Sequence, residues 1–252
     1  MLNPMKIALI TGATSGIGLA TARVLDAAGY NIIATGRREE RLAELAAMLT
    51  NTCHTIAFDV SDYQAAKKAI DSLPIEWQNI DVLVNNAGNA HGMAPIHEGD
   101  VADWDAMIAS NVSGLLYLTR LVSPRMVQRG RGHIVNMGSM AAKQAYANGA
   151  VYSATKAAVD MATQGMRIDL NPYGIKVTAI HPGLVETEFS QVRFKGDIDR
   201  AASVYKGITP LTGDDVAEVI RYVVQSPPHV CLADIVLLPT AQGSVTLVNR
   251  KP

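Results

Sequence analysis

The clearest candidate for chemistry in this chain is a tyrosine and a lysine four residues apart. Tyr152 and Lys156 lie within residues 151–170, a stretch of helical period, so both fall on one face of a helix. A free tyrosine titrates at about pH 10, but a neighbouring ammonium would favour the phenolate and lower its pKa. Ser139 could hold a substrate oxygen near the phenol. The pair alone fits general acid–base catalysis or an ordinary exposed pair on an amphipathic helix.

A glycine-rich turn stands at the first junction between a strand and a helix. The sequence TGATSGIG follows an apolar run at residues 6–10 and leads into a helical pattern. Such a turn lets the backbone approach a pyrophosphate and aims N–H groups at it. The spacing G-x-x-x-G-x-G departs from the G-x-G-x-x-G fingerprint, and a turn that merely needs glycine is the alternative. Its position favours phosphate binding through Gly12, Thr14, Ser15, Gly16, Ile17 and Gly18.

Two arginines occupy the position that would select the dinucleotide. Arg37 and Arg38 follow the second predicted strand, where an acidic residue would bind the ribose hydroxyl of NAD. Guanidinium groups suit a phosphate instead, so we expect NADP. The alternative is that both arginines begin a solvated, charged helix.

Two further strand ends carry small or polar residues where a cofactor would lie. Asp59 could hold the adenine amino group or cap the helix that begins near Tyr63. The predicted contacts at these ends are Asp59, Val60, Asn86, Ala87 and Gly88.

The elements that position these residues alternate between apolar strands and helical patterns. Predicted strands cover residues 6–10, 31–35, 54–60, 81–85, 133–137, 176–181 and 234–238. Predicted helices cover residues 17–28, 40–49, 63–72, 103–128, 151–170 and 214–225. This alternation is typical of an α/β, doubly wound parallel sheet. We expect one domain over residues 1–252, with a substrate lid at residues 183–210.

Composition narrows the class of protein further. Apolar residues make up 48% of the chain, and 22 basic residues against 23 acidic ones give a net charge of −1. No basic field is available for nucleic acid, and no apolar run is long enough to span a membrane. With two cysteines and no signal peptide, we expect a cytoplasmic protein. The histidines form no recognisable ligand set, so we expect no metal.

Taken together, these motifs resemble the short-chain dehydrogenase/reductase superfamily over essentially the whole chain. The resemblance is carried by TGATSGIG, NNAG at residues 85–88, Asn111, Ser139, Tyr152-x-x-x-Lys156 and Pro182-Gly183. It implies a Rossmann-like sheet of seven parallel strands, a homotetramer, and a catalytic tetrad of Asn111, Ser139, Tyr152 and Lys156.

The resemblance also implies a role for each residue. Tyr152 would remove the substrate hydroxyl proton as hydride passes to the nicotinamide, and Lys156 would also bind the nicotinamide ribose. Asn111 would hold a water that links Lys156 to solvent. Contacts to the nicotinamide half are implied for Pro182, Gly183, Val185 and Thr187.

A closer resemblance points to the bacterial NADP-dependent 3-hydroxy acid dehydrogenases. It lies in ATGRREERLAEL, IDVLVNNAGNAHGMAPIHEGDVADW and HPGLVETEFSQVRFKGD. It implies substrates such as L-serine, L-allo-threonine or 3-hydroxypropionate and malonic semialdehyde. An anionic substrate needs a cation, so we expect Arg193 in the lid to bind its carboxylate and Gln144 to make a weaker contact. A solvated loop arginine is the alternative.

Two other functions compete with this interpretation. One is an NADPH-dependent reductase of another ketone, such as a 3-oxoacyl thioester. The other is a non-catalytic nucleotide-sensing protein. The intact set of Ser139, Tyr152 and Lys156 argues against the second, since a mere binder has no chemical need for it.

Overall fold

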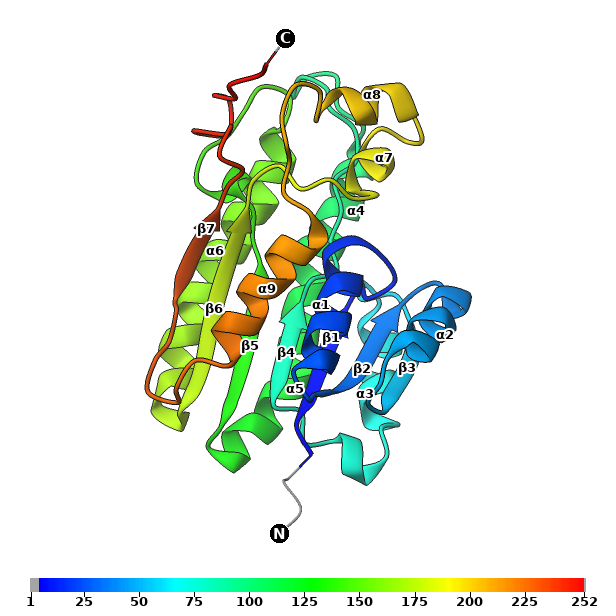
Figure 1. Cartoon of the computed structure of the whole chain (residues 1–252), viewed down its shortest axis with the longest axis vertical. Helices are drawn as coiled ribbons and strands as arrows, with labels where there is room; N and C mark the ends of the chain where they lie inside the picture. The colour runs from blue at the N-terminus through cyan, green and yellow to red at the C-terminus, as the bar shows by residue number, and fades with distance from the viewer. Residues whose placement is uncertain (1–4, 252) are drawn as a thin grey trace.

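The computed structural model describes residues 5–251, which form a single parallel sheet covered by helices on both faces (Figure 1). The strands lie in the order β3-β2-β1-β4-β5-β6-β7. Their bounds are β1 Ile7–Thr11, β2 Asn31–Gly36, β3 Cys53–Ala57, β4 Val82–Asn85, β5 Gly132–Met137, β6 Ile175–Pro182 and β7 Asp234–Leu237. The predicted seven-stranded, doubly wound sheet is confirmed.

α-Helices connect the strands, and short 3₁₀ and π-helical turns lie between some of these elements. The α-helices are α1 Gly16–Ala27, α2 Glu39–Met48, α3 Tyr63–Asp71, α4 Val101–Ile108, α5 Gly114–Arg129, α6 Ala150–Leu170, α7 Phe189–Arg193, α8 Ile198–Ser203 and α9 Gly213–Val224. Short 3₁₀ turns lie at η1 Ile75–Trp77, η3 Met140–Ala142 and η4 Asn171–Tyr173. A π-helical turn, η2 Ala109–Ser113, joins α4 to α5.

Successive strand residues point to opposite faces of the sheet, so each face has its own apolar core. On the face covered by α1, α2 and α9, the fully buried side chains include Ile10, Leu25, Leu42 and Ile220. On the face covered by α3, α5 and α6, the packed side chains include Leu9, Ile70, Leu118 and Met166. Each fully buried leucine or isoleucine stabilises the fold by about 1.5–3 kcal/mol.

The strand order creates a crevice at the carboxyl ends of the central strands. After β3 the chain crosses to β4, which lies on the side of β1 opposite β2. Ile10 of β1 pairs with Val84 of β4. The loops that follow β1 and β4 therefore diverge, which is where ligands bind in open α/β sheets. The segment 183–210, predicted to be irregular, contains α7 and α8 and lies beyond these strand ends (Figure 1).

Two local predictions need correction. The third strand ends at Ala57 rather than at residue 60, and the helix after it is capped by Asp62, not Asp59. The Asp62 carboxylate accepts the backbone N–H groups of Gln64 and Ala65, because it lies directly before the first turn. The helix predicted at residues 103–128 runs from Val101 to Arg129 and includes the π-helical turn.

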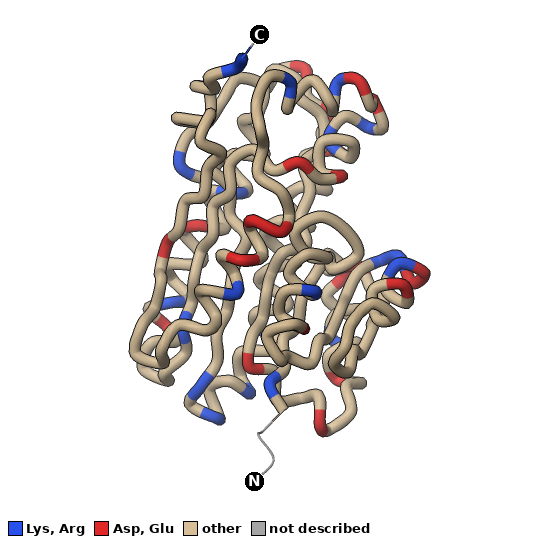
Figure 2. Tube along the Cα trace, viewed as in Figure 1, with Lys and Arg blue, Asp and Glu red and all other residues tan. Residues whose placement is uncertain are grey.

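Acidic and basic positions are interspersed along the chain, and both signs occur side by side at the start of α2 (Figure 2). Within residues 5–251, the helices all fall short of the length and hydropathy needed to cross a membrane.

Candidate active site

One cavity of about 640 Å³ opens at the carboxyl ends of the strands and brings most of the predicted site residues together. It extends from the glycine-rich turn to the catalytic candidates on α6. Its predicted lining residues are Gly12, Thr14, Ser15, Gly16, Ile17, Arg37, Arg38, Asp59, Val60, Asn86, Ala87, Gly88, Ser139, Tyr152, Lys156, Pro182, Gly183, Val185, Thr187 and Arg193.

Two positions of the glycine-rich turn, Gly12 and Gly18, have no room or no suitable backbone conformation for a side chain. Gly12 has a φ of +67°, which favours glycine, and a β-carbon on Gly18 would lie 2.2 Å from the Gly12 carbonyl oxygen. Asn86 fixes the turn from β4 by donating its amide to the carbonyl oxygens of Thr11 and Gly12 at 2.8 and 3.2 Å. Ser15, the N-cap of α1, makes no side-chain cap. The first N–H groups of α1 are therefore available to an anion.

The arginines at the end of β2 behave differently from each other. Arg38 donates to Thr14 Oγ1 at 2.8 Å and to Ser15 Oγ at 3.1 Å, so its guanidinium is anchored against the glycine-rich turn. Arg37 remains 74% exposed and lies 3.6 Å from the Asp59 carboxylate. Asp59 also accepts the Ser61 hydroxyl at 2.7 Å. One edge of the cavity thus carries two guanidinium groups.

An ion-pair network that sequence reasoning missed links this edge to the lid segment. The Glu188 carboxylate accepts Arg41 at 2.7 Å and Arg38 at 3.2 Å. Burial opposes ionisation, but the two guanidinium groups lower the pKa of Glu188 below its usual value. The helical period places Arg41 one turn after Arg38, but no local pattern relates either arginine to a glutamate about 150 residues away.

Asn111 lies in the π-helical turn with its side chain buried. Its amide donates to the Asn89 carbonyl oxygen at 2.8 Å and to Thr155 Oγ1 at 3.1 Å. Its Oδ1 accepts the Asn89 N–H at 2.7 Å. Asn111 therefore joins the loop after β4 to α6, directly beside the segment that carries Tyr152 and Lys156.

Tyr152 and Lys156 are buried on the face of α6 that looks into the cavity. Burial lowers the pKa of Lys156 to about 8, and its ammonium donates to the Met137 carbonyl oxygen at 2.9 Å. Burial also raises the pKa of Tyr152 to about 12, against the lowering effect of Ser139 and Arg193. In the protein alone, burial therefore outweighs the nearby charges, and a phenol pKa lowered jointly by the Lys156 ammonium and an oxidised nicotinamide stays a prediction for the complex.

Arg193 lies beside Tyr152. Its guanidinium carbon is 5.6 Å from the Tyr152 ring centre and 5.3 Å from that of Tyr146, whose hydroxyl accepts a hydrogen bond from it. Its Nε is buried without a partner in the described residues. Arg193 is the predicted cation in the place where an anionic substrate would need it.

Gln144, the second predicted contact to the substrate, is not among the residues that line the cavity. It is exposed and accepts the Val245 N–H at 3.3 Å. Lys195, also in the lid segment, pairs with Asp103 of α4 at 3.0 Å.

His181, for which the sequence indicated no partner, has two carboxylate neighbours. His181 lies within ion-pair distance of Asp160 and Asp234. These residues are separated by 21 and 53 positions along the chain, so their spacing gave no signal.

Comparison with known proteins places the chain in a family. The short chain dehydrogenase family model matches residues 6–197. The chain therefore belongs to the short-chain dehydrogenase family.

Particular relatives match along nearly their whole length. The NADP-dependent 3-hydroxy acid dehydrogenase of Escherichia coli (strain K12) is 46% identical over 247 residues, covering 97% of this chain and 100% of the relative. The serine 3-dehydrogenase of Rhizobium radiobacter is 43% identical over 235 residues, covering 93% and 94%. A solved closed form of serine dehydrogenase complexed with NADP⁺ is 45% identical with a TM-score of 0.93, covering 98% and 100%.

Removing the buried ammonium should change stability in a pH-dependent way. A lysine pKa lowered from 10.5 to about 8 costs the folded state roughly 3 kcal/mol below pH 8. That cost shrinks as pH rises from 8 to 10.5, because the folded state has then released its proton while the unfolded chain still holds one, and it is gone once the unfolded chain deprotonates as well. Allowing about 1 kcal/mol for the lost hydrogen bond, Lys156→Met should exceed wild type by about 2 kcal/mol in free energy of unfolding at pH 7.

Urea denaturation at pH 7 and pH 10 measures this difference, with the exposed Lys68→Met as the control. The advantage of Lys156→Met should shrink at pH 10. An advantage that is absent at pH 7, or that grows with pH, would contradict the burial argument.

Proposed function

We propose that the chain is an NADP-dependent oxidoreductase that acts on the β-hydroxyl or β-carbonyl of small 3-hydroxy acids. One observation carries the proposal: a single cavity joins a glycine-rich turn, against which Arg38 is anchored, to a buried tyrosine that has a guanidinium beside it. Relatives named as NADP-dependent 3-hydroxy acid dehydrogenase and serine 3-dehydrogenase support the same substrate class.

The residues at the cavity fit NADP. The uncapped start of α1 and the glycines of the turn suit the pyrophosphate. Arg38, anchored by Thr14 and Ser15, and Arg37 would hold the 2′-phosphate. Lys156 would hold the nicotinamide ribose. The remaining contacts proposed are Gly16, Ile17, Asp59, Val60, Asn86, Ala87, Gly88, Pro182, Gly183, Val185 and Thr187.

Tyr152 is the proposed general base for oxidation and general acid for reduction. NADP held by these residues would supply a hydride acceptor for the carbon that carries the substrate hydroxyl. The Tyr152 oxygen takes the hydroxyl proton, and Ser139 holds the substrate oxygen by hydrogen bonding. Lowering the Tyr152 pKa from about 12 to about 8 requires roughly 5 kcal/mol of selective phenolate stabilisation. Arg193 already contributes to the value of about 12, so the remaining lowering would come from the Lys156 ammonium and from the positive charge that oxidised NADP would bring.

Arg193 is the proposed ligand of the substrate carboxylate. Its buried Nε lacks a partner within the described residues, and the guanidinium already lies over the Tyr152 ring. An acid held there would place its β-carbon near the phenol. Gln144 is not retained in this role, because its side chain lies outside the cavity.

The segment 183–210 is the proposed lid. Its inner surface is tied to the body at three points: the Gly92 N–H donates to the Arg193 carbonyl oxygen, Lys195 pairs with Asp103, and Glu188 pairs with the arginines of α2 and its N-cap. High similarity to a closed, NADP⁺-bound serine dehydrogenase supports this assignment. A closed lid excludes water and orients the acid.

The proposed setting is a cytoplasmic homotetramer. Exposed apolar side chains on the long helices, Leu116 of α5 and Met161 and Ile168 of α6, support packing between subunits. Both cysteines are free, which is consistent with a reducing compartment.

A rate panel tests the function directly. We expect L-serine, L-allo-threonine or 3-hydroxypropionate to be oxidised with NADP⁺ at a kcat/KM at least tenfold above that of a neutral secondary alcohol. D-Threonine and NAD⁺ complete the panel, and a 3-oxoacyl thioester with NADPH tests the competing reductase. Preference for the thioester, or turnover of none of the acids, would reject the proposal.

Reversing the charge at Arg37 should change cofactor preference. Arg37→Asp places a carboxylate where it repels the 2′-phosphate and can accept a ribose hydroxyl. We expect the ratio of kcat/KM for NADP⁺ to that for NAD⁺ to fall at least tenfold. Arg23→Asp, an exposed arginine on α1 away from the cavity, is the charge-matched control. An unchanged ratio in Arg37→Asp would remove this residue from the phosphate site.

Removing the guanidinium at Arg193 should separate acidic from neutral substrates. Arg193→Met keeps the unbranched stem of the side chain but removes the guanidinium and its charge. We expect KM for hydroxy acids to rise at least tenfold and KM for a neutral alcohol to change less than twofold. Arg200→Met in α8 controls for loss of a lid arginine, because Arg200 lies over the lining residue Phe194 but does not itself line the cavity. Equal effects on both substrates would refute the carboxylate contact.

A further inference from the structure

The His181 ring is buried directly beneath the turn that carries Ser139. Its side chain is 0% exposed, and its Nδ1 lies 3.3 Å from the Ser139 backbone nitrogen and 3.1 Å from the Ser139 carbonyl oxygen. A β-carbon on Gly138 would lie 2.3 Å from Nδ1. The ring therefore packs against the backbone of Gly138 and Ser139 and limits where Ser139 can lie.

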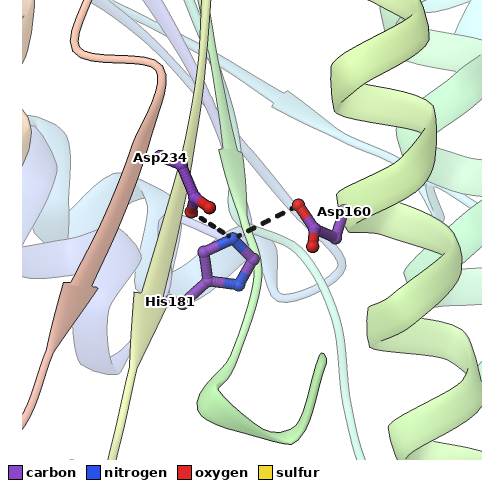
Figure 3. A group of neighbouring side chains, drawn as sticks. All are labelled: Asp160, His181 and Asp234. Atoms are coloured by element: carbon purple, nitrogen blue, oxygen red, sulfur yellow. Dashed lines mark ion pairs between the residues drawn. The ribbon is translucent and has the colours of Figure 1, made fainter. Parts of the chain in front are cut away.

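The opposite edge of the ring faces two carboxylates (Figure 3). His181 Nε2 is 3.0 Å from Asp234 Oδ1 and 3.6 Å from Asp160 Oδ1. The three side chains come from β6, β7 and α6, which the figure shows converging on the ring nitrogen. Lys143 donates to the same carboxylates at 2.8 and 2.7 Å. A lysine ammonium thus already supplies the positive charge that this acidic pair requires.

This cluster joins the Ser139 turn to the helix of the catalytic tyrosine. Asp160 lies four residues after Lys156 and eight after Tyr152, so all three share one face of α6. Lys143 stands at the end of η3, the short turn that begins after Ser139. The end of the turn is therefore held to α6 by the bond from Lys143 to Asp160, while its start lies against His181 of β6.

We propose that His181 is a positioning residue that fixes Ser139 relative to Tyr152, and that it works as the neutral ring with its proton on Nε2. In this form the Nε2–H faces the carboxylates, and the Nδ1 lone pair accepts the Ser139 N–H. A proton on Nδ1 would instead be donated to the Ser139 carbonyl oxygen, 3.1 Å away, and would leave the Ser139 N–H without its acceptor. Because its effect on turnover is transmitted through Ser139, the inference rests on the proposed oxidoreductase function.

The surroundings favour the neutral ring near pH 7. Burial and the Lys143 ammonium lower the pKa of His181 below its usual value of 6.5, although Asp234, the Ser139 carbonyl and Asp160 oppose this. Lys143 also keeps Asp160 ionised, since its hydrogen bond lowers the pKa of that carboxyl despite partial burial.

Substitution at His181 tests the inference in the complete enzyme. Asn carries an amide oxygen close to the position of Nδ1, whereas Leu offers no acceptor. We expect His181→Leu to lower kcat at least tenfold while the KM for the acid and the Kd for NADPH change less than twofold. We expect His181→Asn to retain at least about a third of kcat and to lose the fall in kcat that protonation of His181 causes at low pH in wild type.

His133→Asn is the matched control, because His133 is also buried in the sheet but bonds Thr178. Thermal unfolding of each variant separates loss of fold from loss of positioning. His181→Leu with wild-type kcat, or His181→Asn with the wild-type pH profile, would overturn the proposal. Equal losses of kcat and NADPH binding would also overturn it, since they would indicate a general structural role.

A second measurement does not depend on turnover. In protein labelled with ¹⁵N-histidine, the signal absent from His181→Asn identifies the ring, and its nitrogen shifts report the tautomer at pH 7. We expect a proton on Nε2 and an Nδ1 that accepts a hydrogen bond. A charged ring, or a proton on Nδ1, would refute the positioning role. If wild type oxidises no hydroxy acid, the proposed function fails, while this measurement still decides the state of His181.

Discussion

Burial of a phenol and an ammonium on one helix face is the constraint on which the rest of this structure depends. A dry environment disfavours the charged form of each group, so burial raises the pKa of Tyr152 and lowers that of Lys156. The protein alone thus keeps both groups away from the ion pair that proton transfer requires. The pKa of about 12 already includes the lowering effect of Arg193, so the further positive charge must come from the Lys156 ammonium and from the oxidised cofactor of the proposed function.

The fold keeps Tyr152 and Lys156 buried while leaving one side of their cavity open to ligands. The crevice between the loops after β1 and β4 admits ligands, and the sheet closes the cavity from below. Asn111 fixes the start of the catalytic segment from the loop after β4, and the His181 cluster fixes the Ser139 turn from β6 and β7. Rigid support of this kind lets small changes in charge alter the Tyr152 pKa without moving the ring.

Local patterns were sufficient to predict the sheet, the glycine-rich turn and the Tyr152–Lys156 face. Strand burial and helical period act over a few residues, so they can be seen in the sequence. The π-helical turn around Asn111 could not be predicted, because its apolar pattern matches that of a continuous helix. The cap at Asp62 was missed because Asp59 stands only three positions earlier and belongs to the same residue type.

Long-range ionic contacts account for most of the remaining differences. The pairing of Glu188 with Arg38 and Arg41, and of His181 with Asp160 and Asp234, depends on how distant elements come together. The raised pKa of Tyr152 in the protein alone could not be predicted, because sequence gives the proximity of Lys156 to the phenol but not the degree of burial. Gln144 was misplaced for the related reason that a loop residue has no periodic pattern to orient it.

The central claim is that charge delivered to the cavity makes the Tyr152 phenol acidic. Ultraviolet difference titration of wild type against Tyr152→Phe isolates the ionisation of this ring. The account predicts a Tyr152 pKa of about 12 in the free protein and a pKa lower by at least about two units with NADP⁺ bound. A ring that ionises at the same pH with and without NADP⁺ would contradict it.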